Sequence, residues 1–135
     1  MSVVRAHVGE PSFNGNNMSH FGYHLMLDCS GCNINISSRD AIYNFTKDLV
    51  SRIDMISHGE PIIEYLLQCD PKQGFSMLQL ITTSNITGHF MELDGTAYFD
   101  VFSCKMFDTE IAKAVVQEYF SPTKMRVNFI TRNAD

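Results

Sequence analysis

The chain has 135 residues and a mass of 15.3 kDa, which fits one domain with a single hydrophobic core and excludes two independent domains. Hydrophobic residues make up 44% of the sequence and charged residues 19%, a composition that excludes an intrinsically disordered chain. Fifteen acidic residues against ten basic ones give a net charge near −5, and no basic run is present. Nucleic acid is therefore not expected as a partner.

Membrane insertion and export are not expected either. No stretch approaches the roughly 20 apolar residues of a membrane-spanning helix, and the first residues lack a basic-then-apolar signal pattern. We therefore expect a cytoplasmic protein with no membrane partner, in which Cys29, Cys32, Cys69 and Cys104 are reduced thiols. The spacing Cys29-x-x-Cys32 suits a metal or a small disulfide ring, but no second ligand pair accompanies it, so no metal site is predicted.

The N-terminal part of the chain divides into an arm and the start of a domain. Residues 1–21 are rich in Asn, Ser and Gly without periodicity, which predicts an irregular arm, and residues 22–135 form the domain. The run GYHLMLD at 22–28 alternates as a strand does. Residues 38–53 repeat apolar side chains at three- and four-residue spacing, which predicts a helix capped by Ser37 or Ser38.

Four further strands are predicted next in the chain. The runs IIEYLLQC at 62–69 and FSMLQLIT at 75–82 flank a turn at 70–74, which predicts a hairpin. Residues 86–91 and 96–104 form a second predicted hairpin across an Asp-Gly turn.

A second helix and a last strand complete the predicted order. Asp108 can cap a helix whose apolar residues are helically spaced, and Pro122 ends it before a strand at 125–130. Because the strands do not alternate singly with helices, we expect an α+β fold: a two-layer sandwich of a mainly antiparallel sheet with two helices on one face.

The chemically suggestive segment runs from Thr82 to Cys104. It places Ser84, His89 and Cys104 on consecutive predicted strands, and these residue types can serve as nucleophile, acid–base group and proton donor. Spacing alone favours a turn serine, a hydrogen-bonded strand histidine and a small buried cysteine. Glycine-rich phosphate motifs and the GxSxG elbow are absent from the sequence, so those routes to function are not expected.

Several blocks of the sequence resemble the small prokaryotic form of S-adenosylmethionine decarboxylase, a self-processing pyruvoyl enzyme. The blocks are GYHLMLD, GFSMLQLITTSNITGH and AYFDVFSCKMFD, and they follow one another in the order of the family. The resemblance implies a carboxy-lyase that decarboxylates S-adenosylmethionine for polyamine (spermidine) biosynthesis.

The resemblance also assigns roles to individual residues. It implies self-cleavage before Ser84, which becomes the pyruvoyl group, assisted by Ser76 and His89. That group would condense with the substrate's amino group and accept electrons as carbon dioxide leaves. Cys104 matches the catalytic acid that then reprotonates the carbon.

Strand geometry bears on where these residues lie. Ser84 and His89 are an odd number of residues apart, so a regular strand points them to opposite faces. Ser76 and His89 can face each other across a hairpin that turns near Thr83 and Ser84. One sheet face needs cover, and the family pairs as dimers, so we expect a homodimer in which Ser76 and His89 of one chain meet Ser84 of the other.

Two departures from the family pattern leave alternatives open. Thr83 stands where relatives commonly have Glu, and the Pro-Glu that often follows the histidine is missing. Glu92 lies near that place and is the candidate substrate-binding carboxylate. One alternative is an uncleaved relative that binds S-adenosylmethionine or a similar ligand without decarboxylation. Another is a pyruvoyl decarboxylase of a different amino acid, such as ornithine or arginine.

Overall fold

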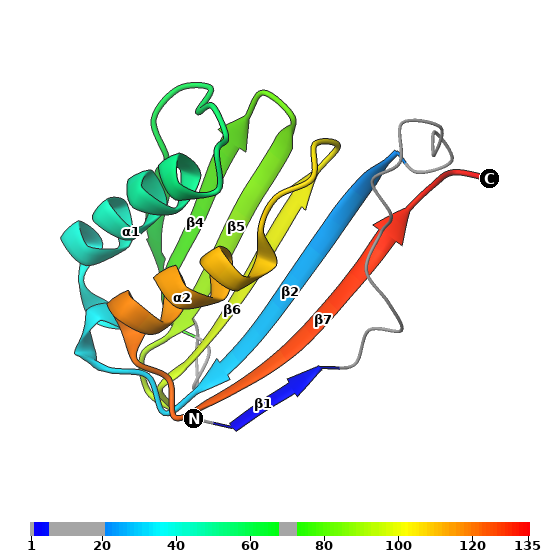
Figure 1. The fold of residues 1–135 in the computed structure, drawn as a ribbon. Helices are drawn as coiled ribbons and strands as arrows, with labels where there is room; N and C mark the ends of the chain where they lie inside the picture. Colours follow the sequence, from blue (N-terminus) through cyan, green and yellow to red (C-terminus); the bar gives the residue numbers. More distant parts are fainter. Residues whose placement is uncertain (1, 6–20, 68–72) are drawn as a thin grey trace.

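The computed structural model describes residues 2–5, 21–67 and 73–135, which form one sheet with two helices packed on one of its faces (Figure 1). The strands are β1 (Ser2–Arg5), β2 (Gly22–Ser30), β3 (Ile62–Leu66), β4 (Gly74–Ile81), β5 (Ser84–Met91), β6 (Thr96–Ser103) and β7 (Lys124–Arg132). The two helices are α1 (Arg39–Arg52) and α2 (Thr109–Phe120), and a single 3-10 turn, η1 (Ile34–Ser37), precedes α1.

The sheet order is β1-β7-β2-β6-β5-β4-β3. Every neighbouring pair is antiparallel except β1 with β7, which is parallel. This arrangement confirms the α+β two-layer sandwich. It also places β5, which begins at Ser84, between β4 and β6 in the sheet interior.

Alternation along the strands gives the sheet two different faces. In β2, Leu25 and Leu27 are fully buried toward the helices, whereas His24 and Met26 are half-buried on the opposite face. The same alternation holds in β4 and β5. We call the face without helices the open face.

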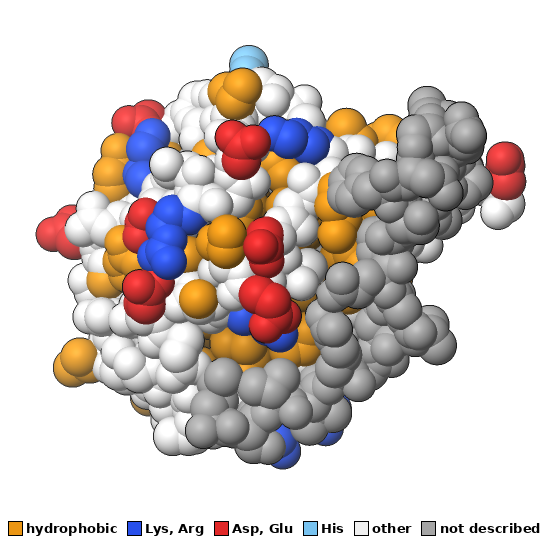
Figure 2. Space-filling model, viewed as in Figure 1, with side chains coloured by type: hydrophobic (Ala, Val, Ile, Leu, Met, Phe, Trp, Pro, Cys, Tyr) orange, Lys and Arg blue, Asp and Glu red, His pale blue; other side chains and the backbone are white. Residues whose placement is uncertain are grey.

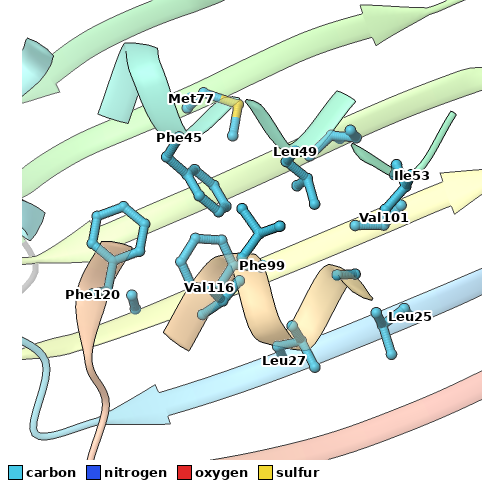
Figure 3. Packing of buried hydrophobic residues seen from close by; sticks show 14 of the residues in the cluster. Leu25, Leu27, Phe45, Leu49, Ile53, Met77, Phe99, Val101, Val116 and Phe120 are labelled. Atoms are coloured by element: carbon cyan, nitrogen blue, oxygen red, sulfur yellow. The ribbon is translucent and has the colours of Figure 1, made fainter. Parts of the chain in front are cut away.

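The helices begin where the sequence predicts and cover the core. Ser38 Oγ accepts a hydrogen bond from the Ala41 amide, 3.1 Å, and Asp108 Oδ1 accepts from the Glu110 amide, 2.9 Å. Phe45 of α1 lies between its neighbours from β6 and α2, with ring centroids 5.3 Å from Phe99 and 4.9 Å from Phe120 (Figure 3). These aromatic contacts tie both helices to the sheet.

The outer surface of the helical layer carries charged side chains of both signs (Figure 2). Arg52 of α1 contacts Asp48 one turn earlier at 3.5 Å and Glu118 of α2 at 2.5 Å. This side of the sandwich is therefore built to face water.

The N-terminal arm requires one correction. The prediction of an irregular segment over 1–21 is wrong for residues 2–5, which form β1 beside β7. Four residues are too few for an alternating pattern to stand out, and this strand is defined by its long-range partner. Residues 1 and 6–20 lie outside the described residues.

Strand ends also differ from the predicted ones. β3 ends at Leu66, and the rest of its predicted run to Cys69 lies, with most of the following turn, in the undescribed segment 68–72. β5 begins at Ser84 rather than Ile86, which shortens the preceding turn to Thr82 and Thr83. That shorter turn places the candidate serine at the first position of a strand.

Candidate active site

Ser84 lies at the start of β5, directly after the two-residue turn between β4 and β5. It pairs with Ile81 across this hairpin and with Ser103 on β6. Its φ is 155°, a backbone conformation that residues with a Cβ rarely adopt. Such strain costs on the order of 1–3 kcal/mol and is held in place by the surrounding sheet.

The peptide bond before Ser84 is held by the end of β6. The Thr83 carbonyl oxygen accepts a hydrogen bond from the Cys104 amide, 2.9 Å. Cys104 itself is an exposed free thiol, so its side chain is accessible to solvent beside this peptide. The turn, the serine and the cysteine thus form one group, which we call the Ser84 half-site (Thr83, Ser84 and Cys104).

Ser76 and His89 form a second group on the same hairpin. They are paired in register across β4 and β5, as predicted, and Ser76 Oγ lies 3.0 Å from His89 Nδ1. The neighbours Ile86 and Phe90 are buried toward the helices, so His89 projects from the open face and is exposed. We call this pair the His89 half-site.

The two half-sites do not meet within one chain. Ser84 and His89 are five residues apart on β5, about 17 Å along a strand. A reaction that uses Ser84 together with His89 therefore needs a second copy of the chain.

Glu92 is remote from Ser84 in the same way. It follows β5, about 26 Å along the strand from Ser84. Its carboxylate accepts a hydrogen bond from the Tyr65 hydroxyl, an interaction that raises the pKa of Tyr65. Within one chain Glu92 adjoins the end of β5 beyond His89, so it can contribute only to a site built around that end.

A polar row on the open face was missed by the sequence reasoning. Asp100 of β6 accepts a hydrogen bond from His24 Nε2 at 2.8 Å and lies 3.5 Å from the Thr87 hydroxyl. Arg132 lies beside the same ring, with its Nη1 3.4 Å from His24 Nδ1. Asp100 lies in the segment AYFDVFSCKMFD, but its partner His24 is 76 residues away, and no local pattern connects them.

Low pH should reduce the stability that Asp100 contributes to the folded protein. The hydrogen bond from His24, followed by the charges of His24 and His89, lowers the pKa of Asp100 below its ordinary 3.8, although partial burial opposes this. Because the pKa of Asp100 is lower in the folded than in the unfolded protein, its carboxylate stabilises the folded state at pH values above the unfolded pKa. This stabilisation is lost as the pH falls through the pKa of the folded state. We expect the difference in unfolding free energy between wild type and Asp100→Asn to shrink below about pH 4, measured by urea denaturation. Asp135→Asn, at an exposed position, is the matched control; an equal change there would contradict the assignment.

The cysteines fall into two chemical types. Burial raises the pKa of Cys29 to about 12 and that of Cys32 to about 11, so both thiols stay protonated at neutral pH. Both are free, as is Cys104; Cys69 lies outside the described residues. Protonated thiols are poor metal ligands and nucleophiles, which leaves Cys104 as the exposed thiol among the three cysteines that the structure describes. Over residues 2–5, 21–67 and 73–135, no cluster of three or more His, Cys, Asp or Glu side chains could hold a metal, and no helix has the length and apolar character to cross a membrane.

Fold and site together define a class: a small α+β sandwich with a strained, hydrogen-bonded peptide before a strand-initial serine, a thiol beside it and a serine–histidine pair on the same hairpin. The family model described as S-adenosylmethionine decarboxylase matches residues 23–133. The chain belongs to the S-adenosylmethionine decarboxylase family.

Individual relatives and a solved structure agree with this membership. An S-adenosylmethionine decarboxylase proenzyme of Clostridium botulinum (strain Langeland) is 30% identical over 85% of this chain and 97% of the relative. A proenzyme of the same name from Thermomicrobium roseum is 27% identical over 85% of this chain and 96% of its own length. The crystal structure of the adenosylmethionine decarboxylase from Aquifex aeolicus VF5 superposes with a TM-score of 0.73 over 87% of this chain and 94% of that chain; at 17% identity this likeness shows the shared fold.

Proposed function

We propose that this chain is a self-processing S-adenosylmethionine decarboxylase that uses a pyruvoyl group derived from Ser84. The observation that carries the proposal is the Ser84 half-site: a strained peptide whose carbonyl oxygen is already hydrogen-bonded to the Cys104 amide, directly before a serine hydroxyl. Family membership supports the same chemistry, because relatives are named as proenzymes. Its product would supply aminopropyl groups for polyamine synthesis.

The residues of the Ser84 half-site fit the requirements of self-cleavage. Attack of Ser84 Oγ on the Thr83 carbonyl carbon places negative charge on the carbonyl oxygen, and the Cys104 amide is directed at that oxygen. Breaking the peptide bond also releases the backbone strain at Ser84. The resulting ester then loses the Ser84 Cα proton and the Thr83 carboxylate, and water replaces the nitrogen to leave a ketone and ammonia.

The pyruvoyl ketone supplies an electrophile for the substrate's amino group and an electron sink for decarboxylation. Cys104 adjoins the position of that ketone and is exposed, so its thiol can deliver the proton that replaces the lost carboxylate. In the His89 half-site, the imidazole paired with Ser76 Oγ can transfer the proton removed during elimination.

Release of labelled carbon dioxide tests the substrate. Protein that mass spectrometry shows to be cleaved before Ser84 is incubated with carboxyl-labelled S-adenosylmethionine, and in parallel with carboxyl-labelled ornithine and arginine. We expect release from S-adenosylmethionine alone. Release only from ornithine or arginine would transfer the assignment to another amino acid, and release from none of the three would remove it.

A second candidate function is an uncleaved relative that binds S-adenosylmethionine or a similar ligand. Thr83 favours it, because a neutral hydroxyl replaces the carboxylate that commonly precedes the processing serine in the family. Titration of S-adenosylmethionine onto freshly purified intact chain separates the two functions. Binding without later cleavage or turnover would favour the binding protein.

We expect the working unit to be a homodimer with two composite sites. An isologous pair that brings the Ser84 half-site of one chain to the His89 half-site of the other creates both sites at once. The open face supports such a pairing, since Leu80 and Tyr98 expose apolar surface there, at 47% and 41%.

Mixing two inactive variants tests the composite site. Ser84→Ala lacks the nucleophile and His89→Ala lacks the proton carrier, so neither should process at the wild-type rate alone. A mixture of chains should restore cleavage of the His89→Ala chain, followed by mass spectrometry. A mixture no faster than the separate variants, or a monomer by light scattering at micromolar concentration, would contradict shared sites.

A further inference from the structure

Thr83, the residue that supplies the scissile carbonyl, is also held through its side chain. The Lys105 amide donates to Ser103 Oγ at 3.0 Å, Ser103 Oγ donates to Thr83 Oγ1 at 2.8 Å, and Thr83 Oγ1 donates to Met55 Sδ at 3.3 Å. Ser103 Oγ also lies 3.7 Å from Met55 Sδ, so the two hydroxyls share this sulfur as an acceptor while they hydrogen-bond to each other. Ser103 is completely buried, so water does not compete for its hydroxyl.

The residues at both ends of this hydrogen-bonded series, Met55 and Lys105, are held in place by the fold. Met55 is buried just after α1. Lys105 is anchored to the same loop, because its Nζ donates to the Asp54 carbonyl oxygen at 2.7 Å and to the Asp54 carboxylate at 3.1 Å. The Ser103 hydroxyl is therefore positioned by the sheet and by the end of α1 together.

Two consecutive residues, Ser103 at the end of β6 and Cys104 directly after it, thus hydrogen-bond to Thr83 in the turn before β5. Ser103 holds the Thr83 hydroxyl, and the Cys104 amide holds the Thr83 carbonyl oxygen at 2.9 Å. Two attachment points on one residue restrict rotation of the Thr83–Ser84 peptide plane, which a single hydrogen bond to the carbonyl does not. The angle at which Ser84 Oγ meets the carbonyl carbon depends on that plane.

We propose that Ser103 is a positioning residue for self-cleavage: by holding the Thr83 hydroxyl, it orients the Thr83 carbonyl for attack by Ser84. The inference rests on the proposed self-processing and adds to it a step and a residue. The affected step is the first one, in which the Ser84 Oγ–Thr83 carbon bond forms, the Thr83 carbon–Ser84 nitrogen bond breaks, and the hydroxyl proton passes to the nitrogen. The product is an ester with a free amino group, and no further reactant is needed.

Removal of either hydroxyl tests the inference. Thr83→Val keeps the shape of the side chain without its hydroxyl, and Ser103→Ala removes the group that holds it. Each should slow formation of fragments 1–83 and 84–135 by about tenfold or more. The double variant should be no slower than the slower single one, because both changes remove the same interaction. Ser103→Thr, which restores a hydroxyl, should recover most of the rate.

Thr82→Val is the matched control, since it removes a hydroxyl from the exposed neighbouring turn position and should cleave at the wild-type rate. Thermal unfolding of each change in an uncleavable Ser84→Ala background separates folding from processing. A purely structural pair would lower the melting temperature while folded protein still cleaves at the wild-type rate, and that result would overturn the inference. If Ser103→Ala does not fold, Thr83→Val at the half-buried turn decides the question by its rate alone.

Hydroxylamine identifies the affected step, because it cleaves an accumulated ester far faster than a peptide bond. His89→Ala should accumulate ester and yield fragment 84–135 with an intact N-terminal serine. Ser103→Ala should accumulate none, so hydroxylamine should leave its cleavage slow; rapid cleavage by hydroxylamine would place the defect after the acyl shift and contradict the assigned step. Failure of the proposed function looks different: wild type itself would yield no fragments.

Discussion

Ser84→Ala is expected to remain a single chain and to release no carbon dioxide from S-adenosylmethionine. Without the hydroxyl at the start of β5 there is no nucleophile at the strained peptide, and the held Thr83 carbonyl has nothing to react with. Without cleavage there is no ketone to accept electrons, so decarboxylation should fall to the uncatalysed level, a loss of at least about 10⁶-fold. Gel electrophoresis and labelled carbon dioxide release measure the two effects.

Asn85→Ala is the control for this variant, because it changes the next residue of β5 and leaves the hydroxyl in place. It should cleave and turn over. If Ser84→Ala were to cleave at the wild-type position, the nucleophile would have to be another group. If it stayed intact yet released carbon dioxide, the pyruvoyl mechanism would be wrong.

Cys104→Ala should separate processing from turnover. The backbone amide that holds the Thr83 carbonyl is unchanged by this substitution, so fragments 1–83 and 84–135 should still form at a rate close to that of wild type. The thiol that delivers the proton after loss of carbon dioxide is gone, and kcat should fall by about 100-fold or more, as for loss of a general acid. A kinetic comparison of fully cleaved wild type and fully cleaved variant measures this.

Cys32→Ala removes a protonated, half-buried thiol in a different part of the fold and should keep its turnover. Two results would contradict the role of Cys104. One is full turnover by cleaved Cys104→Ala. The other is a complete block of its cleavage, which would place the thiol in processing instead.

Local sequence signals were sufficient for the helices and for the pairing of Ser76 with His89. Helix starts depend on capping side chains within three residues, and both Ser38 and Asp108 accept the expected backbone hydrogen bonds. A two-residue turn after Ile81 brings Ser76 opposite His89 by simple counting along antiparallel strands. Such features involve neighbours in the sequence, or strands joined by a short turn.

The contacts that hold the scissile peptide were not predictable in this way. Ser103 and Thr83 are 20 residues apart, at the ends of the β5–β6 hairpin farthest from its turn, and the sequence predicted β5 to begin only at Ile86, which left Thr83 outside the pairing. Asp100 of β6 and His24 of β2 are hydrogen-bonded although they are 76 residues apart in the sequence and are diagonal rather than direct partners in the strand register. Register between strands without a short connection is set by the packing of the whole sheet, and a single sequence does not display it.

The mass of the wild-type chain after prolonged incubation tests the central claim most directly. Self-processing predicts two species, residues 1–83 with a free C-terminal carboxylate and residues 84–135 with a pyruvoyl end that resists Edman sequencing. A single species that stays at 15.3 kDa would contradict the pyruvoyl mechanism.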